Sequence, residues 1–592
     1  MNGDPVPAGE DVSLRLAMRE AVSSRLAMRD AVYSVIGSRR DVRRRFLGDP
    51  VPPEVVDRVL RAAHQAPSVG LSQPWDFLLV TDEAVRRRIA AHVEEQRRVF
   101  AASLTSARGS DFDRLKIQAI LDAPLNVVVT STLERGGVRV LGRHIQPETA
   151  AYSTCLAIEN LWLAARAEGL GVGWVSFYQP TDLSALLDLP PHVSPIAYLC
   201  IGWVEEFDAR PELAQAGWAS PRPLHWAVHH ERWGQHEGMR PFEEAMASLS
   251  APDAAAARAA EEYQGRLTKP PGSLGYLEVL GSRLAAISGS LPPPVPAPAT
   301  VAVFAADHGV VAEGVTPWPS EVTTQMVGNF CAGGAAINVI ARQIGVDVVV
   351  VDVGVAATLD PAPGLIRRKV RAGTANILTE PGMSREESQR ALDVGAEVAR
   401  ELVASGNRCL VTGDMGIGNT TPSAALIAYF SGRPAVDVTG RGTGIDDETL
   451  RRKLAVVEGA LERTARDVEP GDFVGALASL GGLEIAALAG YIVGGAAARV
   501  PVVVDGVIAC AGLLVASALA PGVIEYCFAG HRSVEPGARV ALEKLGLRPL
   551  LDLDLRLGEG TGGCLALPIL QSSARVLGEM ATFDQAGVSE KS

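Results

Sequence analysis

The chain has 592 residues, more than one domain usually holds, so we expect two to four domains. Its composition, 47% hydrophobic and 21% charged residues, is typical of a globular protein in solution. A formal net charge of −13 argues against nucleic acid or an anionic membrane as the main partner. The seven cysteines form no C-x-x-C pair, which predicts a protein without disulfides or structural zinc. No apolar run reaches membrane-spanning length and no secretion signal opens the chain, so we expect a cytoplasmic protein.

A short duplication lies near the N-terminus. Residues 15–22 recur almost unchanged as residues 25–32. An offset of ten residues is too short for a repeat architecture. We therefore interpret residues 1–30 as a helical extension, with no function implied.

An arginine cluster follows, with five arginines among residues 38–45. Such a run is most often a solvated helix end, but guanidinium groups also suit bidentate contacts to phosphate. Asp41 lies inside the cluster, and nearby arginines would lower its pKa. Both interpretations, solvated surface and phosphate grip, remain open on these residues alone.

The next segments predict a mixed α+β module. We expect helices over 53–64 and 149–168, and strands over 77–80, 126–130 and 195–203. A Pro-, Ser- and Gly-containing loop precedes the first strand. The Gly-rich string 171–177 leads to Ser176, which we expect to be buried, and whose hydroxyl could simply satisfy a backbone group.

Four motifs in this order resemble the 5,6-dimethylbenzimidazole synthases of the BluB type, which have a nitroreductase-like fold. They are the Arg39-Arg40-Asp41-Val42-Arg43 string, the loop 66–75, the Gly173-Trp174-Val175-Ser176 string and residues 198–203, within a match over about 32–233. The resemblance implies that reduced FMN reacts with O₂ to give dimethylbenzimidazole and erythrose 4-phosphate, so that FMN is consumed and a flavin reductase must supply it. It further implies catalytic roles for Asp41 and Ser176, and FMN binding by Arg39, Arg40, Arg43, Ser68, Gly70, Gln73 and Gly173.

In the second half, Val-rich runs alternate with helical patterns. The runs 300–306, 346–351, 408–412 and 500–504 each lead into a turn that contains Asp and Gly. Continuous apolar runs between helices are typical of buried parallel strands, and ligands bind at the carboxyl ends of such strands. The pattern predicts an α/β parallel sheet with four acidic turns converging on one site.

Further glycine-rich strings predict anion binding and proton transfer. Residues 416–423 form a Gly-rich turn before a helix, which suits a phosphate but lacks the ending of an ATP-binding P-loop. The string 441–444 is a second such loop, and Lys453 is either its cation or a solvated helix residue. Glu559, among the glycines of 556–563, is either the carboxylate of a tight turn or a general base. The glycine-dense segment 481–495 indicates close helix packing.

This half, from about 255 to 578, resembles the nicotinate-nucleotide:dimethylbenzimidazole phosphoribosyltransferases of the CobT type. The matching strings lie at residues 269–275, 306–309, 321–323, 416–422 and 556–560. The resemblance implies that Glu559 is the general base and Asp414 a second catalytic carboxylate, where some relatives carry Glu. It implies that substrates bind at Asp307, His308, Glu321, Met326, Gly416, Gly418, Asn419, Thr420, Thr421, Lys453, Gly558 and Gly560. Trp318 and Met326 replace polar groups that face the base in some relatives.

Together these observations predict a fusion of two enzymes. An α+β nitroreductase-like FMN module (31–235) precedes a linker (236–252) and an α/β, Rossmann-like phosphoribosyltransferase module with a small helical subdomain (253–592). An FMN reductase or nitroreductase using NAD(P)H, or a non-catalytic flavin-binding scaffold, are the alternatives for the first module. We expect small-molecule substrates, no metal, and a homodimer by analogy with both families.

Overall fold

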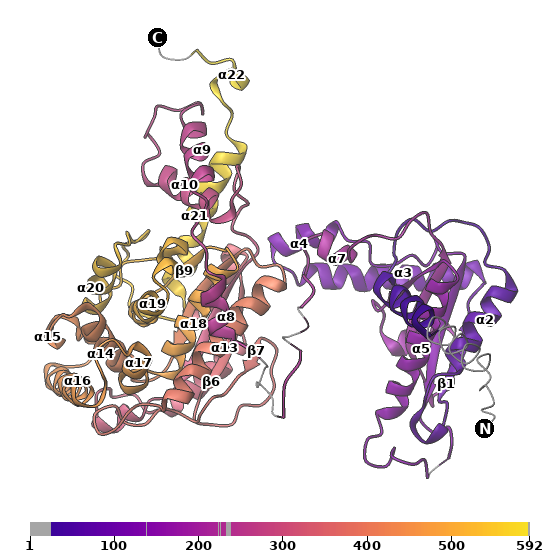
Figure 1. The fold of residues 1–592 in the computed structure, drawn as a ribbon, viewed down its shortest axis with the longest axis horizontal. Helices are drawn as coiled ribbons and strands as arrows, with labels where there is room; N and C mark the ends of the chain where they lie inside the picture. Colours follow the sequence, from indigo (N-terminus) through magenta and orange to yellow (C-terminus); the bar gives the residue numbers. More distant parts are fainter. Residues whose placement is uncertain (1–24, 138, 223, 225–226, 232–237, 590–592) are drawn as a thin grey trace, which may run out of the picture. The chain divides into compact units, whose positions relative to one another are not determined.

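The computed structural model describes residues 25–137, 139–222, 224, 227–231 and 238–589 (Figure 1). Its contacts divide the chain into two compact units, Met1–Leu104 with Gly109–Trp218 and Thr105–Arg108 with Ala219–Ser592. The first copy of the N-terminal duplication lies outside the described residues, and the second falls in a helix over 25–38. Across the described ranges, no helix combines the length and hydropathy needed to cross a membrane.

The first unit is built on an antiparallel sheet of four strands in the order β1-β2-β4-β3. Its strands are β1 (Trp75–Leu79), β2 (Leu125–Thr132), β3 (Leu170–Val175) and β4 (Val193–Trp203). Its helices are α2 (Pro53–His64), η1 (Val69–Leu71), α3 (Glu83–Ala102), α4 (Ser106–Asp113), α5 (Thr149–Ala167), α6 (Pro180–Leu186) and α7 (Glu212–Gln215). The predicted helices and strands are all present, and the first strand begins two residues earlier than expected.

Alternation along the central strands supplies two apolar cores. Val127 and Val129 of β2 pack with α2 and α5 on one face of the sheet, while Val128 packs with α3 on the other. Successive side chains of a strand point to opposite faces, so a strand covered on both sides is apolar throughout. The helices thus sandwich the sheet and leave β3 at its edge.

The second unit contains a parallel sheet of six strands in the order β10-β9-β8-β5-β6-β7. The strands are β5 (Ala299–Ala306), β6 (Asp347–Gly354), β7 (Leu365–Arg367), β8 (Cys409–Met415), β9 (Val502–Val504) and β10 (Cys527–Ala529). The four predicted strands are adjacent at the centre. The two outer strands were not predicted, because each is only three residues long and lacks the Val-rich run ending in Asp and Gly that marked the equally short β9.

Helices cover both faces of this sheet. The side chain of Leu410 lies against Gly495 of α18 (Leu483–Ala497), and that of its neighbour Val411 lies against Gly563 of α21 (Thr561–Glu579). The other helices of this unit are α8 (Pro241–Ser248), α9 (Ala254–Gln264), α10 (Tyr276–Ser288), η3 (Gly309–Glu313), α11 (Glu321–Cys331), α12 (Ala336–Ile344), α13 (Arg385–Ala404), α14 (Thr420–Ser431), α15 (Ala435–Val438), α16 (Asp447–Asp467), α17 (Phe473–Leu480), α19 (Val507–Leu519), η4 (Pro521–Tyr526), α20 (Pro536–Leu545) and α22 (Phe583–Ala586).

A small helical subdomain projects from this sheet (Figure 1). It combines α9 and α10 with α21, which come from opposite ends of the second unit's sequence. An ion pair between Lys269 and Glu278 (2.8 Å) fixes the turn that enters α10.

The segment before α9 packs against the second unit. Phe242 of α8 is buried in the large core, and its N–H and the Arg240 guanidinium both contact the Asp393 carboxylate of α13. The predicted linker is therefore partly helical and attached to this unit, while the exact domain limits stay a prediction.

Candidate functional site

The acidic turns of the second unit meet at the carboxyl edge of the parallel sheet. Strands β9, β8, β5 and β6 are neighbours, and Asp505, Asp414, Asp307 and Asp352 stand at or just beyond their ends. All four side chains are buried. Among the described residues no group of His, Cys, Asp and Glu side chains is arranged to hold a metal ion.

Glu559 lies on the loop that enters α21 at this edge. Gly558, Glu559 and Gly560 all have positive φ (81°, 62° and 88°), a conformation that non-glycine residues rarely adopt. The Glu559 carboxylate accepts the backbone N–H of Ile337 at 3.2 Å and is 5% exposed. Burial raises the pKa of Glu559, the Ile337 N–H opposes this effect and the Asp505 charge adds to it, so the carboxylate is a stronger base than an ordinary Glu.

Asp414 lies against the same loop. Its Oδ2 accepts the Asn419 side-chain N–H at 3.0 Å, and a Cβ placed on Gly558 would lie 3.1 Å from that oxygen. Burial, together with the charges of Asp505, Glu484 and Glu559, raises the pKa of Asp414 well above its ordinary value. The second predicted carboxylate is thus brought close to the first.

The Gly416–Thr421 turn rests on a buried histidine. His308 Nε2 lies 2.9 Å from Glu484 Oε1, and both side chains are almost fully buried. A Cβ on Gly416 would lie 2.5 Å from the Ala306 carbonyl oxygen and 3.1 Å from His308 Nε2, so glycine is needed there. The hydroxyl of Thr323 on α11 accepts the Ile417 N–H at 3.1 Å, which fixes the turn from the other side.

Lys453 of α16 is buried beside this turn. Its Nζ donates to Thr420 Oγ1 (2.8 Å) and to the Gly440 carbonyl (3.0 Å). Burial lowers the pKa of Lys453 to about 8, opposed by the charge of Glu535. The alternative of a solvated helix lysine is therefore wrong, because packing of α16 on α14 encloses the side chain.

The residues expected around the base have mixed environments. Glu321, the first residue of α11, is exposed, and Met326 is half-buried. Trp318, just before this helix, is 50% exposed. Asp307 accepts the Ala356 N–H at 2.7 Å, which ties β5 to the loop after β6.

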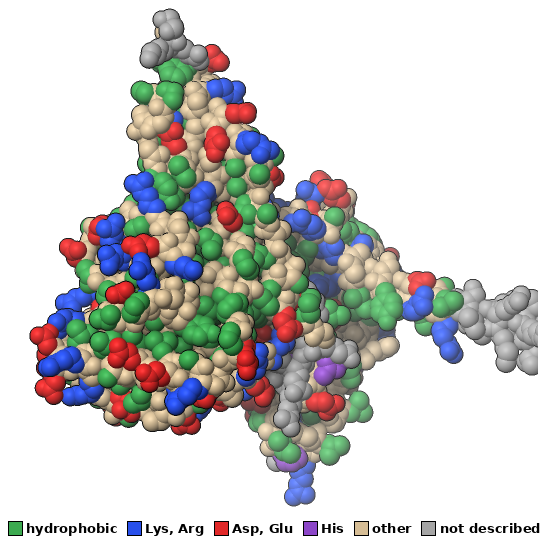
Figure 2. All heavy atoms as spheres, turned by 60° about the vertical axis from the view of Figure 1, so that its left-hand side comes forward, with side chains coloured by type: hydrophobic (Ala, Val, Ile, Leu, Met, Phe, Trp, Pro, Cys, Tyr) green, Lys and Arg blue, Asp and Glu red, His purple; other side chains and the backbone are tan. Residues whose placement is uncertain are grey.

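Exposed apolar side chains of this unit also include Val436, Val534, Leu553 and Leu557. Figure 2 shows apolar side chains gathered across one face of it, with charged groups around them.

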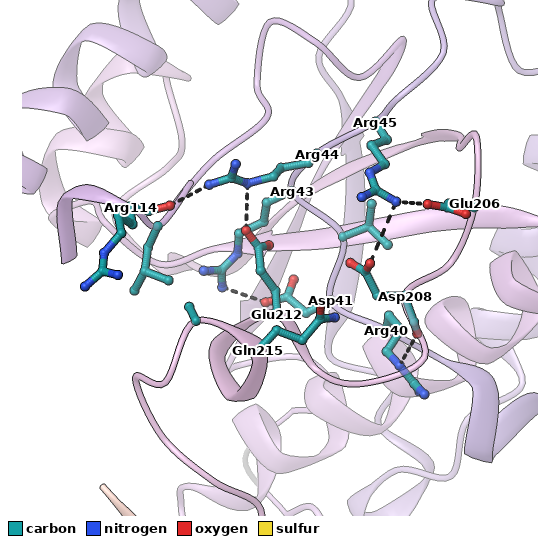
Figure 3. A pocket seen from close by; sticks show the side chains of 13 residues that line it. Arg40, Asp41, Arg43, Arg44, Arg45, Arg114, Glu206, Asp208, Glu212 and Gln215 are labelled. Carbon is teal, nitrogen blue, oxygen red and sulfur yellow. Dashed lines mark hydrogen bonds and ion pairs between the residues drawn. The ribbon is translucent and has the colours of Figure 1, made fainter. Parts of the chain in front are cut away.

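In the first unit, the arginine cluster lines a hollow of about 290 Å³ (Figure 3). Most of its guanidinium groups already have partners. Arg40 donates to the carbonyls of Asp208 and Ala209, Arg44 pairs with Glu212, and Arg45 pairs with Glu206. Arg39 lies over the Trp162 ring. The cluster therefore anchors the segment after β4 as well as facing the hollow.

Asp41 joins this cluster to the glycine string of β3. Its carboxylate accepts the Trp174 N–H at 3.1 Å and pairs with Arg43 at 2.6 Å. A Cβ on Gly173 would lie 2.1 Å from the Val42 carbonyl, so this approach requires glycine. The expected lowering of the Asp41 pKa is wrong: burial raises it, and outweighs the opposing Arg43 charge.

Other predicted flavin residues lie apart from this cluster. Ser176 is exposed, contrary to expectation, because it lies one residue beyond the end of β3 at Val175. Ser68 accepts the Gln73 N–H at 2.9 Å within its own loop, and Gly70 packs against Val140. Arg43 Nε is buried with no hydrogen-bond partner among the described residues, which leaves a donor for an anionic ligand. The region of Arg43, Asp41 and Gly173 therefore fits a flavin.

Four buried residues at the carboxyl edge of the second unit's sheet were not among the predicted site residues. They are Glu484, Asp505, His531 and Glu535. Asp505 lies in one of the four acidic turns predicted to converge here, but no role was predicted for its side chain. His531 and Glu535 follow β10, a strand too short to be predicted, so their position at this edge was not expected. Glu484 lies in the glycine-dense segment that was interpreted as helix packing only.

Comparisons with known proteins agree with this geometry. The sequence model of the phosphoribosyltransferase family matches residues 249–588, and that of the nitroreductase family matches residues 36–203. The chain therefore belongs to the phosphoribosyltransferase family and carries a nitroreductase-family module ahead of it. Both predicted fold classes are confirmed.

The individual relatives that match the second unit share one name within this family. The nicotinate-nucleotide–dimethylbenzimidazole phosphoribosyltransferase of Salinispora tropica is 54% identical over 364 residues, which cover 59% of this chain and 100% of that protein. The Chloroflexus aggregans protein of the same name is 54% identical over 339 residues, covering 57% of this chain and 95% of the relative. The crystal structure of the Thermus thermophilus enzyme superposes with a TM-score of 0.54 at 50% identity, covering 57% of this chain and all of that one.

Proposed function

We propose that the second unit transfers phosphoribose from nicotinate mononucleotide to 5,6-dimethylbenzimidazole, giving α-ribazole 5′-phosphate and nicotinate. The observation that carries this proposal is the meeting of Glu559, Asp414 and the Lys453 turn at one edge of the sheet. The sequence identity of 54% to two relatives, over 100% and 95% of their lengths, supports the proposal.

Each group has a role in this reaction. Glu559 removes the N–H proton of the benzimidazole as the other ring nitrogen attacks the ribose carbon. Lys453 and the N–H groups of the Gly416–Thr421 turn hold the phosphate. As nicotinate leaves, the ribose gains positive charge. The carboxylates gathered at this edge favour that charge, because a positive charge among them is attracted to each ionised group.

We further propose that the first unit makes the acceptor base by O₂-dependent fragmentation of reduced FMN. FMN is the substrate here, and its isoalloxazine supplies the dimethylbenzimidazole. The residues that would hold it are Arg43, Gly173 and the 68–73 loop, with Asp41 beside the ring as the catalytic carboxylate and Ser176 as its partner. Support comes from the fused transferase, which consumes the product expected of this module. This product is the lower-ligand base of cobalamin.

One assay separates this function from its alternatives. Chemically reduced FMN and O₂ are supplied to the full chain. Loss of isoalloxazine absorbance with equimolar dimethylbenzimidazole supports fragmentation. NAD(P)H oxidation with flavin conserved would instead identify a reductase, and flavin binding without turnover a scaffold. Adding nicotinate mononucleotide and dimethylbenzimidazole, with detection of α-ribazole phosphate, tests the second unit separately.

A further inference from the structure

The backbone that carries Glu559 is held in a conformation it would not adopt alone. Glu559 has φ 62° between two glycines that also have positive φ. A side chain with a Cβ is disfavoured in this region, so the surrounding structure must impose it. The loop also packs tightly on β8, since a Cβ on Gly413 would lie 2.7 Å from the Glu559 carbonyl oxygen.

Asp505 accepts two backbone N–H groups of this loop, both C-terminal to Glu559. Its Oδ2 accepts the N–H of Gly560 at 3.1 Å, and its Oδ1 accepts the N–H of Gly563 at 2.8 Å. Gly560 is the N-cap of α21 and has no side chain with which to cap the helix. Asp505, from the end of β9, supplies the missing cap and fixes the residue next to Glu559 in the same contact.

Asp505 is in turn fixed from two neighbouring strands. Its N–H donates to the Thr412 hydroxyl of β8 at 2.9 Å. His531, just beyond β10, places Nε2 3.6 Å from Asp505 Oδ1. A Cβ on Gly562 would lie 2.0 Å from the His531 ring, so a glycine at that position admits the histidine. The side chain of Asp505 is therefore immobilised under the loop.

We propose that Asp505 is a positioning residue for phosphoribosyl transfer, which holds the Glu559 loop in its strained, reactive conformation. The inference rests on the proposed function of the second unit. It assigns Asp505 no contact with substrate: it acts through Glu559. An amide at this position would turn an N–H donor toward the N–H of Gly560 or Gly563, and the loop would lose one of its two anchors.

The test compares Asp505→Asn with wild type in steady-state transfer by the full chain. A misplacement on the order of 1 Å costs about 10² in rate, so we expect kcat to fall by about that factor. The KM for nicotinate mononucleotide should stay near the wild-type value, because Lys453 and its turn are untouched. The matched control is Asp472→Asn, which removes a carboxylate that accepts the N–H of Gly475 in the first turn of α17 at 3.0 Å, and should leave kcat unchanged.

A double-mutant cycle separates positioning from a general structural role. If Asp505 acts through Glu559, Asp505→Asn should cause no further loss of kcat in a Glu559→Gln background. Additive losses would overturn the proposal, and so would a wild-type kcat in Asp505→Asn. Should Asp505→Asn not fold, Thr412→Val, which removes only the hydroxyl anchor, enters the same cycle. Its non-additive loss supports the proposal, and a wild-type kcat or an additive loss overturns it. A wild-type chain without transfer activity would instead refute the proposed function itself.

Discussion

At the scale of single residues, Glu559 is the general base of the reaction proposed for the second unit. Removal of a general base typically costs 10²–10⁴ in rate, so Glu559→Ala should reduce α-ribazole phosphate formation by about that range. Flavin fragmentation should continue, since the two units have separate cores. Glu579→Ala, at the exposed far end of the same helix, is the control. Transfer from added dimethylbenzimidazole at the wild-type rate would show that another group takes the proton.

The lowered pKa of Lys453 predicts that kcat/KM for phosphoribosyl transfer falls at alkaline pH. In the proposed reaction protonated Lys453 binds the phosphate of nicotinate mononucleotide, and burial lowers its pKa to about 8. As the pH rises through about 8, the free enzyme loses this charge, so kcat/KM should fall. Bound phosphate favours the ammonium, so kcat should change less. Lys453→Met should raise KM at pH 7 and remove this limb, whereas Lys544→Met, on the surface of α20, should do neither.

Asp41 makes the corresponding prediction for the first unit. Asp41→Asn keeps the shape and the hydrogen-bond capacity toward Trp174 but removes the charge beside Arg43. FMN binding should persist while dimethylbenzimidazole formation stops, measured by fluorescence titration and by chromatography. Ser176→Ala should slow the same reaction. Asp49→Asn, an exposed residue of the same unit, should match wild type. Normal dimethylbenzimidazole yield from Asp41→Asn would remove Asp41 from the mechanism.

The residue environments show where the sequence was insufficient. The glycines near Glu559 were expected to admit a ligand, and this stays a prediction; Gly560 and Gly173 also lie where a Cβ would collide with the protein itself. The direction of the Asp41 pKa shift and the burial of Ser176 were wrong. Both depend on three-dimensional surroundings: the packing of Asp41 against β3, and the position of Ser176 just beyond the end of that strand. Neither property is encoded in a local string.

At the scale of elements, the glycines of α13 and α18 allow these helices to pack closely. A Cβ on Gly490 would lie 1.9 Å from the Leu392 carbonyl oxygen, and one on Gly395 would lie 1.8 Å from that of Ala487. Gly490→Ala should lower the free energy of unfolding by about 1–3 kcal/mol through overpacking, measured by denaturant titration. Gly328→Ala in α11 meets open space and should be neutral or stabilising by up to about 1 kcal/mol. Equal stabilities for the two variants would contradict close packing.

The same scale explains why the sheet was partly readable. Strands β5, β6, β8 and β9 are apolar runs that end in Asp and Gly, so their parallel arrangement and common ligand edge could be predicted. β10 has three residues and no such ending, yet its position beside β9 brings His531 to Asp505. The partners of Glu559 therefore follow from strand order, which local patterns do not contain.

At the scale of the whole molecule, the question is whether the base passes directly between the two units. A typical enzyme turns over at about 10 s⁻¹, and a free small molecule diffuses away far faster than that. Sharing a chain therefore does not by itself retain the dimethylbenzimidazole. We therefore expect coordinated supply without tight channelling. Each unit has its own buried core, so the chain can also be expressed as two halves divided between Trp218 and Arg240.

The experiment follows a label from FMN into α-ribazole phosphate. Labelled reduced FMN, O₂, nicotinate mononucleotide and excess unlabelled dimethylbenzimidazole are given to the full chain and, in parallel, to the two halves mixed at equal concentration. Free exchange predicts that the unlabelled base dilutes the label equally in both. The full chain carrying Asp41→Asn should make no labelled base, so it measures the background label in α-ribazole phosphate. Label retained by the full chain but diluted by the halves would contradict this expectation, and would require a path for dimethylbenzimidazole that avoids bulk solvent.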